Sequence, residues 1–193
     1  MKIKWSYVIL GIGVVAFTGG FIYRHQIKRG LKDVINYAFT KEQEYYLSEL
    51  HSKYIDVFKK FISEGESKTG YKVLITSGFR TFPEQIKLHA ENPQNASVGK
   101  SMHNYGLAID INLISKLDGH IIRKADSTKT WEDTGIVKIA KKYGLKWGGG
   151  GSFGTYADNV HFEIPLGGAN LYAQAIKQFG SESKVIGNKI QIT

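Results

Sequence analysis

The alternation of apolar and polar residues along the chain predicts a mixture of helices and strands. Behind Thr40, which fits a capping box with Gln43, apolar side chains recur at helical spacing, so residues 41–64 are expected to form an amphipathic helix. Leu107 to Leu113 instead alternates between apolar and polar residues, which is typical of a half-buried strand. The other expected elements are strands at 71–76 and 160–164, helices at 83–89, 131–143 and 168–179, an irregular loop at 91–102 and a hairpin at 185–192. Without regular βαβ spacing, this mixture favours the α+β class.

The N-terminal segment has a different pattern. Trp5 to Tyr23 is a 19-residue stretch without a charged side chain. As a helix it would be about 28 Å long, close to the hydrocarbon thickness of a bilayer. It therefore favours a single-pass anchor contacting the lipid bilayer through residues 5–23, with a cleaved signal peptide or a buried core helix as alternatives. The expected organisation is a transmembrane anchor at 1–24, a basic juxtamembrane linker at 25–40 and a folded domain at 41–193.

Composition and charge limit the chemistry that the domain can use. The chain of 193 residues has a net charge of +9, but the first 40 residues hold six Lys and Arg against one Asp, so the remainder is only mildly basic. We see neither a basic helix nor a stacking sheet signature, and no nucleic-acid partner is expected. With 0 Cys, the chain has no thiol nucleophile and no cysteine-based zinc finger. Any transition metal must be bound by His and carboxylate side chains.

Three residues in the second half of the chain have the chemistry of metal ligands. Asp110 and His161 each lie on the polar face of an expected strand, and His103 lies on the loop that leads into the first of them. Two imidazoles and one carboxylate would leave a zinc ion a fourth position for water, as in hydrolytic zinc centres. The spacing alone also allows hydrogen-bonded structural histidines and an Asp110 that pairs with a lysine.

Four motifs in a fixed order resemble a known family. Ser101 to Asp110 matches SxHxxGxAxD, and Asp158 to Phe162 matches the DxxHF that follows it. Ser77 to Thr81 matches an SGFRT-type turn, and Lys146 to Gly149 matches KWGG. Together, over roughly 70–166, they resemble the VanY-type zinc D-alanyl-D-alanine carboxypeptidases and L-alanyl-D-glutamate endopeptidases, which include phage endolysins. The resemblance implies a hedgehog-like α+β fold, with a small mixed or antiparallel sheet and flanking helices, here behind the N-terminal transmembrane helix.

The resemblance also implies roles for individual residues. His103, Asp110 and His161 would bind Zn²⁺. Asp158 would be the general base that takes a proton from water and passes it to the leaving amine, with a loop N-cap as the structural alternative. Arg80 would stabilise the developing oxyanion or hold a substrate carboxylate, with a surface ion pair as the alternative.

Further residues are expected around the cleft. We predict that Ser101, Trp147 and Gln85 bind substrate, although Ser101 could instead cap its loop and Trp147 could belong to the core. Glu163 shares a strand face with His161 and would either support that ligand or face solvent. The glycine-rich stretch from Gly148 to Gly154 lacks the family's usual acidic and aromatic continuation, so the sequence does not predict this wall of the cleft.

The resulting functional prediction is a zinc-dependent peptidoglycan hydrolase that cleaves stem peptides. The carboxypeptidase branches usually have Glu where this chain has Asp158, so the resemblance favours the L-alanyl-D-glutamate endopeptidases. D-alanyl-D-alanine carboxypeptidase activity and a non-catalytic wall-binding module are the alternatives. The substrate implies a single-pass membrane protein whose peptidase domain faces the cell wall or periplasm, although the charges flanking residues 5–23 are nearly balanced.

Overall fold

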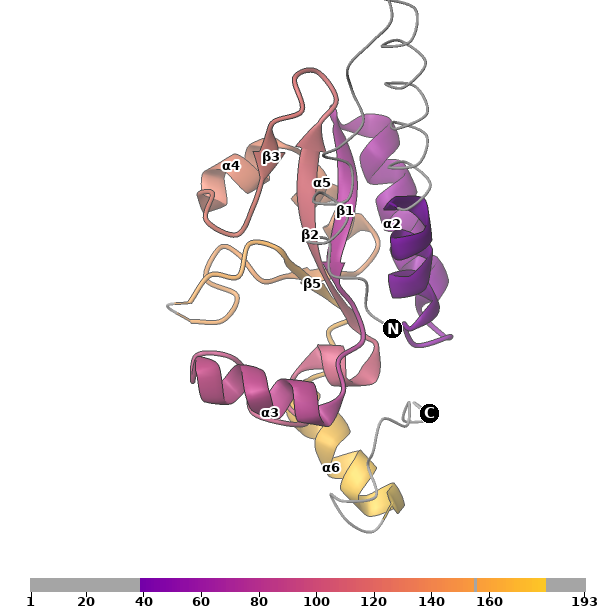
Figure 1. Cartoon of the computed structure of the whole chain (residues 1–193), viewed down its shortest axis with the longest axis vertical. Helices are drawn as coiled ribbons and strands as arrows, with labels where there is room; N and C mark the ends of the chain where they lie inside the picture. Colours follow the sequence, from indigo (N-terminus) through magenta and orange to yellow (C-terminus); the bar gives the residue numbers. More distant parts are fainter. Residues whose placement is uncertain (1–38, 155, 180–193) are drawn as a thin grey trace, which may run out of the picture. The chain divides into compact units, whose positions relative to one another are not determined.

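The computed structural model describes residues 39–154 and 156–179. The chain divides into two compact units, 1–41 and 42–193, and every helix and strand after residue 50 that is named below belongs to the second. A helix covers residues 39–48. The elements after it, labelled in Figure 1 where there is room, are α2 (Ile55–Lys68), β1 (Tyr71–Ser77), α3 (Phe82–Glu91), a 3-10 helix (Met102–Tyr105), β2 (Ala108–Ser115), β3 (Ile121–Ile122), α4 (Thr128–Asp133), α5 (Ile136–Lys142), β4 (Lys146–Trp147), β5 (His161–Glu163) and α6 (Gly168–Phe179).

The sheet is antiparallel at every described pairing. Its strands follow the order β1-β2-β5-β4, and β3 pairs with the far end of β2. In Figure 1, β1 and β2 run side by side along most of their length, and β5 meets β2 near the start of that strand. Asp110 lies opposite Ser77 on one side and opposite His161 on the other. The register therefore places three polar residues from distant parts of the sequence across one end of the sheet.

The core lies on the opposite face of β2. Ile109, Ile111 and Leu113 are all fully buried, as their alternation with polar residues predicts. Helix α2 packs against β1, and its Phe61 ring lies 5.2 Å from the Phe162 ring of β5. Because aliphatic and aromatic side chains fill this face, the polar face of β2 is left for the site.

The predicted helix at 41–64 is two helices with a break between them. Residues 39–40 are already helical, so Thr40 is not the N-cap, and the Gln43 side chain bonds the backbone of Ile75 through both its polar atoms. At the break, the His51 amide donates to Gly106 O at 2.9 Å. A Cβ atom on Gly106, whose φ is +67°, would lie 2.7 Å from His51 N. The break allows the chain to pass close to the turn that follows the 3-10 helix.

Two other helix predictions can be compared with the structure. The predicted helix at 83–89 is α3, which begins behind Thr81 with a complete capping box to Glu84. The predicted helix at 131–143 is instead divided into α4 and α5. Thr134 is the C-cap of α4, and Gly135, whose φ is +80°, is the N-cap of α5, so the backbone changes direction between the two helices.

The fold class predicted from the sequence needs one correction. Its antiparallel sheet and flanking helices agree with the observed elements, but the prediction also included a transmembrane helix. Within residues 39–154 and 156–179, no helix combines the length and the apolar character that crossing a bilayer requires. The prediction was wrong to include that helix, and residues 5–23, to which it was assigned, lie outside the described residues. So do most of the predicted linker and the predicted hairpin at 185–192.

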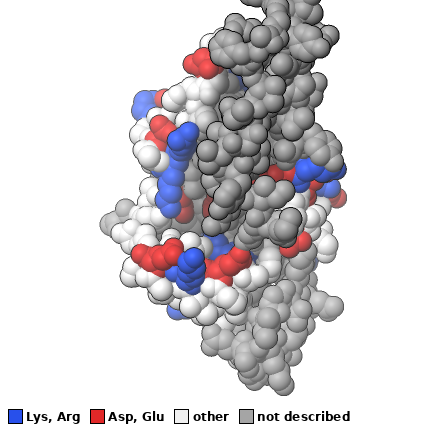
Figure 2. All heavy atoms as spheres, in the orientation of Figure 1, with Lys and Arg blue, Asp and Glu red and all other residues white. Residues whose placement is uncertain are grey.

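The charged side chains on the face shown in Figure 2 are mixed in sign. Lys and Arg lie among Asp and Glu over the part of the chain that is described. Charges of the described domain are also paired: Glu64 Oε1 of α2 lies 3.1 Å from Lys68 Nζ, and Glu64 Oε2 lies 2.6 Å from Lys142 Nζ. The face of the described domain seen in this view is therefore not a continuous cationic field of the kind that binds polyanions.

Candidate metal centre and active site

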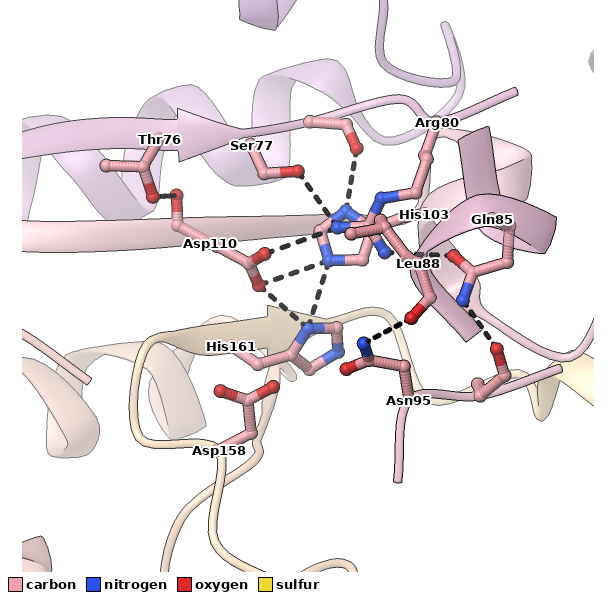
Figure 3. Close-up of polar contacts among 12 residues, drawn as sticks. Thr76, Ser77, Arg80, Gln85, Leu88, Asn95, His103, Asp110, Asp158 and His161 are labelled. Carbon is pink, nitrogen blue, oxygen red and sulfur yellow. Dashed lines mark hydrogen bonds and ion pairs between the residues drawn. The ribbon is translucent and has the colours of Figure 1, made fainter. Parts of the chain in front are cut away.

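The three predicted metal ligands meet at one point. His103 Nε2 lies 3.1 Å from Asp110 Oδ1 and 3.1 Å from His161 Nδ1, and the last two atoms lie 3.0 Å apart. Figure 3 shows the three side chains converging from the 3-10 helix, β2 and β5. Donor atoms that bind one tetrahedral zinc ion at about 2.0–2.2 Å are roughly 3.3 Å apart, so the observed spacing is close to that of such a ligand set.

The partners of the two imidazoles determine which ring nitrogens carry protons. His103 Nδ1 lies 2.6 Å from Gly78 O, and His161 Nε2 lies 3.0 Å from Glu163 Oε2. Because a carbonyl and a carboxylate can only accept, neutral rings place their protons on these outer nitrogens. His103 Nε2 and His161 Nδ1 then direct lone pairs at each other and at Asp110 Oδ1. Three mutually facing acceptors are unfavourable without a cation, so this chemistry fits a bound divalent metal.

The charges of the cluster are strongly coupled. Burial alone would raise the pKa of Asp110, but the adjacent His103 and His161 outweigh it and hold that pKa well below its usual range. Burial would likewise lower the pKa of His161, whereas its bonds to Asp110 and Glu163 raise it to about 9. For the chain without an ion, the Asp110 carboxylate therefore stays charged more readily, and His161 binds a proton more readily, than the free side chains do.

Glu163 lies behind His161 and supports it. Of the two alternatives left open by the sequence, support of this ligand or exposure to solvent, the structure shows the first. The residue is 8% exposed, and its carboxylate accepts from His161 Nε2. The pairing of β4 with β5 places Lys146 opposite Glu163, with Lys146 Nζ 3.6 Å from Oε1. A carboxylate fixed in this way sets the orientation of the imidazole that it holds.

Asp158 lies on the same turn as His161. The His161 amide donates to Asp158 O at 3.0 Å, and the Asp158 amide donates to Gly148 O at 2.9 Å. A Cβ atom on Gly148 would lie 2.6 Å from Asp158 O, so the glycine of the KWGG motif permits this close approach. In Figure 3 the Asp158 carboxylate points toward the His161 ring. This places a carboxylate beside the ligand set without making it a ligand.

Arg80 approaches the ligand set from the other side. One guanidinium nitrogen donates to Gln85 Oε1 at 2.9 Å, and another donates to Ser77 Oγ at 3.1 Å and lies 3.6 Å from Asp110 Oδ2. Its backbone is also fixed, because the Arg80 amide donates to His103 O at 2.9 Å. The guanidinium is thus a positive charge held in one place beside the centre.

The three predicted substrate-binding residues lie in different environments. Gln85 is 1% exposed and uses its amide to join Arg80 to Ala96 O, which places it behind Arg80. Trp147 is 5% exposed, and its indole donates to Asn159 O at 2.7 Å, so it supports the turn that carries Asp158. Ser101 is 8% exposed, and its hydroxyl bonds none of the three ligands. Substrate binding by these residues stays a prediction.

Two neighbours of the site were absent from the sequence interpretation. Phe153, in the glycine-rich loop, is 38% exposed, and its ring lies 5.7 Å from the His161 ring. Lys124 Nζ lies 3.1 Å from Asp158 Oδ1. No periodicity or motif marks either residue. The one signal that the sequence offered for Phe153 was an aromatic residue in a glycine-rich stretch. The sequence offered no signal for Lys124.

Sequence comparisons find similarity to known peptidases. Residues 94–164 match the sequence family described as D-alanyl-D-alanine carboxypeptidase. The peptidoglycan L-alanyl-D-glutamate endopeptidase CwlK of Bacillus subtilis (strain 168) is 37% identical over an alignment 108 residues long, which covers 49% of this chain and 62% of CwlK. The predicted resemblance to the VanY-type carboxypeptidase and endopeptidase family is thereby confirmed. The chain spans less than two thirds of the length of this curated relative.

Two solved structures were also found to be similar. The Serratia marcescens L-Ala D-Glu endopeptidase ChiX has a TM-score of 0.48 and 17% identity, over 64% of this chain and 86% of that one. A vancomycin resistance D,D-pentapeptidase VanY mutant, in complex with Zn(II), has a TM-score of 0.46 and 15% identity, over 65% of this chain and 79% of that one.

Proposed function

We propose that this protein is a zinc metallopeptidase that cleaves peptidoglycan stem peptides and works on the side of the membrane that faces the cell wall. The observation that carries the proposal is the convergence of three lone pairs, from His103, Asp110 and His161, beside a carboxylate that is not part of the set. Two imidazoles and one carboxylate are a common ligand set of hydrolytic zinc, which leaves a position for water.

The residues around this set divide the work of hydrolysis. A zinc ion held there would acidify water and polarise the scissile carbonyl. Asp158 accepts the proton of the attacking water and delivers it to the leaving amine. Arg80, a permanent cation, stabilises the negative charge that develops on the carbonyl oxygen. The hydrogen bonds that Arg80 donates to Ser77 and Gln85 keep its guanidinium in place, so little reorganisation is needed during the reaction.

Among stem-peptide bonds, we propose the bond between L-alanine and D-glutamate as the target. The similarity to CwlK, whose name states this activity, supports it, as does the aspartate at position 158. A second candidate is the release of a terminal D-alanine, because the matching family carries the description D-alanyl-D-alanine carboxypeptidase. Arg80 could hold the terminal carboxylate in that reaction.

The test is product analysis with the full chain loaded with zinc and incubated with defined muropeptides. An L-alanyl-D-glutamate endopeptidase leaves a new N-terminal D-glutamate, which mass spectrometry identifies, whereas a carboxypeptidase releases free D-alanine. Asp158→Asn at equal zinc content is the control for turnover at this site. A protein that binds one zinc ion tightly but cleaves no muropeptide would be a wall-binding module, and the proposal would fail.

A further inference from the structure

A lysine from a distant segment contacts the proposed base. Lys124 Nζ lies 3.1 Å from Asp158 Oδ1, across 34 positions of the sequence. That oxygen is buried and, among the described residues, forms no hydrogen bond of good geometry, so the contact is an ion pair. The Lys124 ammonium also lies 5.2 Å from the centre of the Tyr156 ring. The lysine therefore meets two residues of the segment that carries the base.

The turn that carries Lys124 is rigidly built. The Asp126 amide donates to Arg123 O at 3.0 Å, and the Arg123 amide donates to Asp126 Oδ2 at 2.6 Å. The indole of Trp131, a fully buried residue, donates to Arg123 O at 3.0 Å. The backbone on which Lys124 sits is thus closed on itself and fixed to the core.

A second set of bonds fastens this turn to the turn of the base. The Asn159 side chain donates to Asp126 O at 2.9 Å and accepts from Thr128 Oγ1 at 3.3 Å. Asn159 is 5% exposed and directly follows Asp158 in the chain. One buried amide therefore joins the segment of the lysine to the segment of the carboxylate, and their approach is a built feature of the fold.

The pair also differs from two ion pairs formed within helices of the described domain. In the pairs Lys129–Asp133 and Lys87–Glu91, the carboxylates are 63% and 59% exposed and lie one helical turn from their lysines. The Asp158 carboxylate is only 21% exposed and meets a lysine from another element. A partly buried pair holds its geometry better than an exposed pair, whose side chains are solvated and free to move.

We propose that Lys124 is a positioning residue for the base of the proposed peptidase. By occupying Oδ1, its ammonium fixes the rotation of the Asp158 carboxylate, so that the second oxygen is available for the proton of the attacking water. The proposal rests on the proposed function, in which Asp158 is the base. A residue of this kind changes turnover more than substrate binding, because the geometry that it controls is needed in the transition state.

The test compares Lys124→Met with Lys129→Met in the full chain loaded with zinc. Both variants remove one lysine of an ion pair in the same region, but the partner of Lys129 is the exposed carboxylate of Asp133 and not the base. For Lys124→Met we expect kcat to fall about 10- to 100-fold, the range typical of an outer partner of a site residue, with KM changed less than threefold. Zinc content and Tm should match those of Lys129→Met, and Lys124→Arg should recover most of kcat.

Three results would overturn the proposal. They are a kcat for Lys124→Met within twofold of wild type, a loss of turnover matched by loss of zinc, and a loss that Lys129→Met reproduces. A crystal structure of zinc-loaded Lys124→Met provides a readout independent of turnover. We expect its Asp158 carboxylate to be rotated or in more than one conformation. An unchanged carboxylate would reject the role of Lys124 even if the wild-type protein cleaved no muropeptide, whereas that absence of cleavage alone would count against the proposed function only.

Discussion

The substitution Glu163→Gln tests whether the carboxylate behind His161 strengthens metal binding. Glu163 Oε2 accepts from His161 Nε2 at 3.0 Å, and the residue is 8% exposed, so water does not readily replace it. Glutamine keeps nearly the same shape but removes the charge, and its amide can turn an N–H toward Nε2. That N–H would favour the tautomer whose proton is on Nδ1, the atom that faces the other ligands.

The expected size follows from this contact. Outer partners of metal ligands typically contribute 10- to 100-fold to metal affinity. We expect Glu163→Gln to weaken zinc binding by about that factor, which corresponds to roughly 1.4–2.7 kcal/mol. Lys146, the other partner of Glu163, is 40% exposed at its side chain, so solvent can take over part of its interaction and the effect should centre on His161.

The assay is competition with a chelator of known zinc affinity, read as the free-zinc concentration at half occupancy. Glu91→Gln is the matched control, because it makes the same chemical change at a 59% exposed carboxylate paired with Lys87. If the zinc affinity of Glu163→Gln equals that of Glu91→Gln, the hydrogen bond to His161 has no part in binding the metal. The proposed role of Glu163 in orienting His161 toward the metal would then be refuted.

Three further predictions concern the base, a turn and acid stability. Asp158→Ala should retain near wild-type zinc occupancy while muropeptide cleavage falls at least about 100-fold, since only proton transfer is removed; a parallel loss of zinc would contradict this. Gly106→Ala should lower the free energy of unfolding in urea by about 2 kcal/mol or more, because φ is +67° and the added Cβ meets His51 N at 2.7 Å; an unchanged midpoint would show that the turn can relax. The hydrogen bonds that the Glu64 carboxylate accepts from Lys142, Tyr143 and Lys68 lower its pKa from 4.5 to about 2. The stability that these bonds give the folded domain is therefore complete above pH 4.5 and is lost as the pH falls toward 2. Glu64→Gln should therefore be less stable than wild type at neutral pH, with the difference shrinking between pH 4.5 and 2 in thermal melts.

The strands were the most predictable part of the fold. Alternation at Leu107 to Leu113 identified the buried face of β2 and, with it, the direction of Asp110. His161 could be placed on the matching face of its strand by the same argument. That these two residues lie opposite each other depends on strand register, which short strands do not specify by themselves; the order of the family motifs supplied that information.

The parts that sequence reasoning missed depend on contacts between distant segments. Apolar spacing is continuous through the break at residues 49–54, because Leu50 is fully buried there as well, so the pattern could not reveal that the helix ends. Gln43 looked like a capping residue but bonds the backbone of Ile75. Lys124 reaches Asp158 only because Asn159 fastens two turns together, and no local pattern encodes that meeting.

The order of the ligands along the chain has a consequence for biosynthesis. His103 and Asp110 are made before His161, which lies 58 residues after the first of them on the short strand β5. A nascent chain that has not yet added β5 to the sheet has two of the three ligands in place, and Asp158, three residues before His161, is not yet held beside them. The affinity of a complete site contributes to stability only when that strand is in place, so capture of the ion favours the finished domain over partly assembled forms. The proposed peptidase activity therefore requires β5, and it is withheld until synthesis has passed His161 and that strand has joined the sheet.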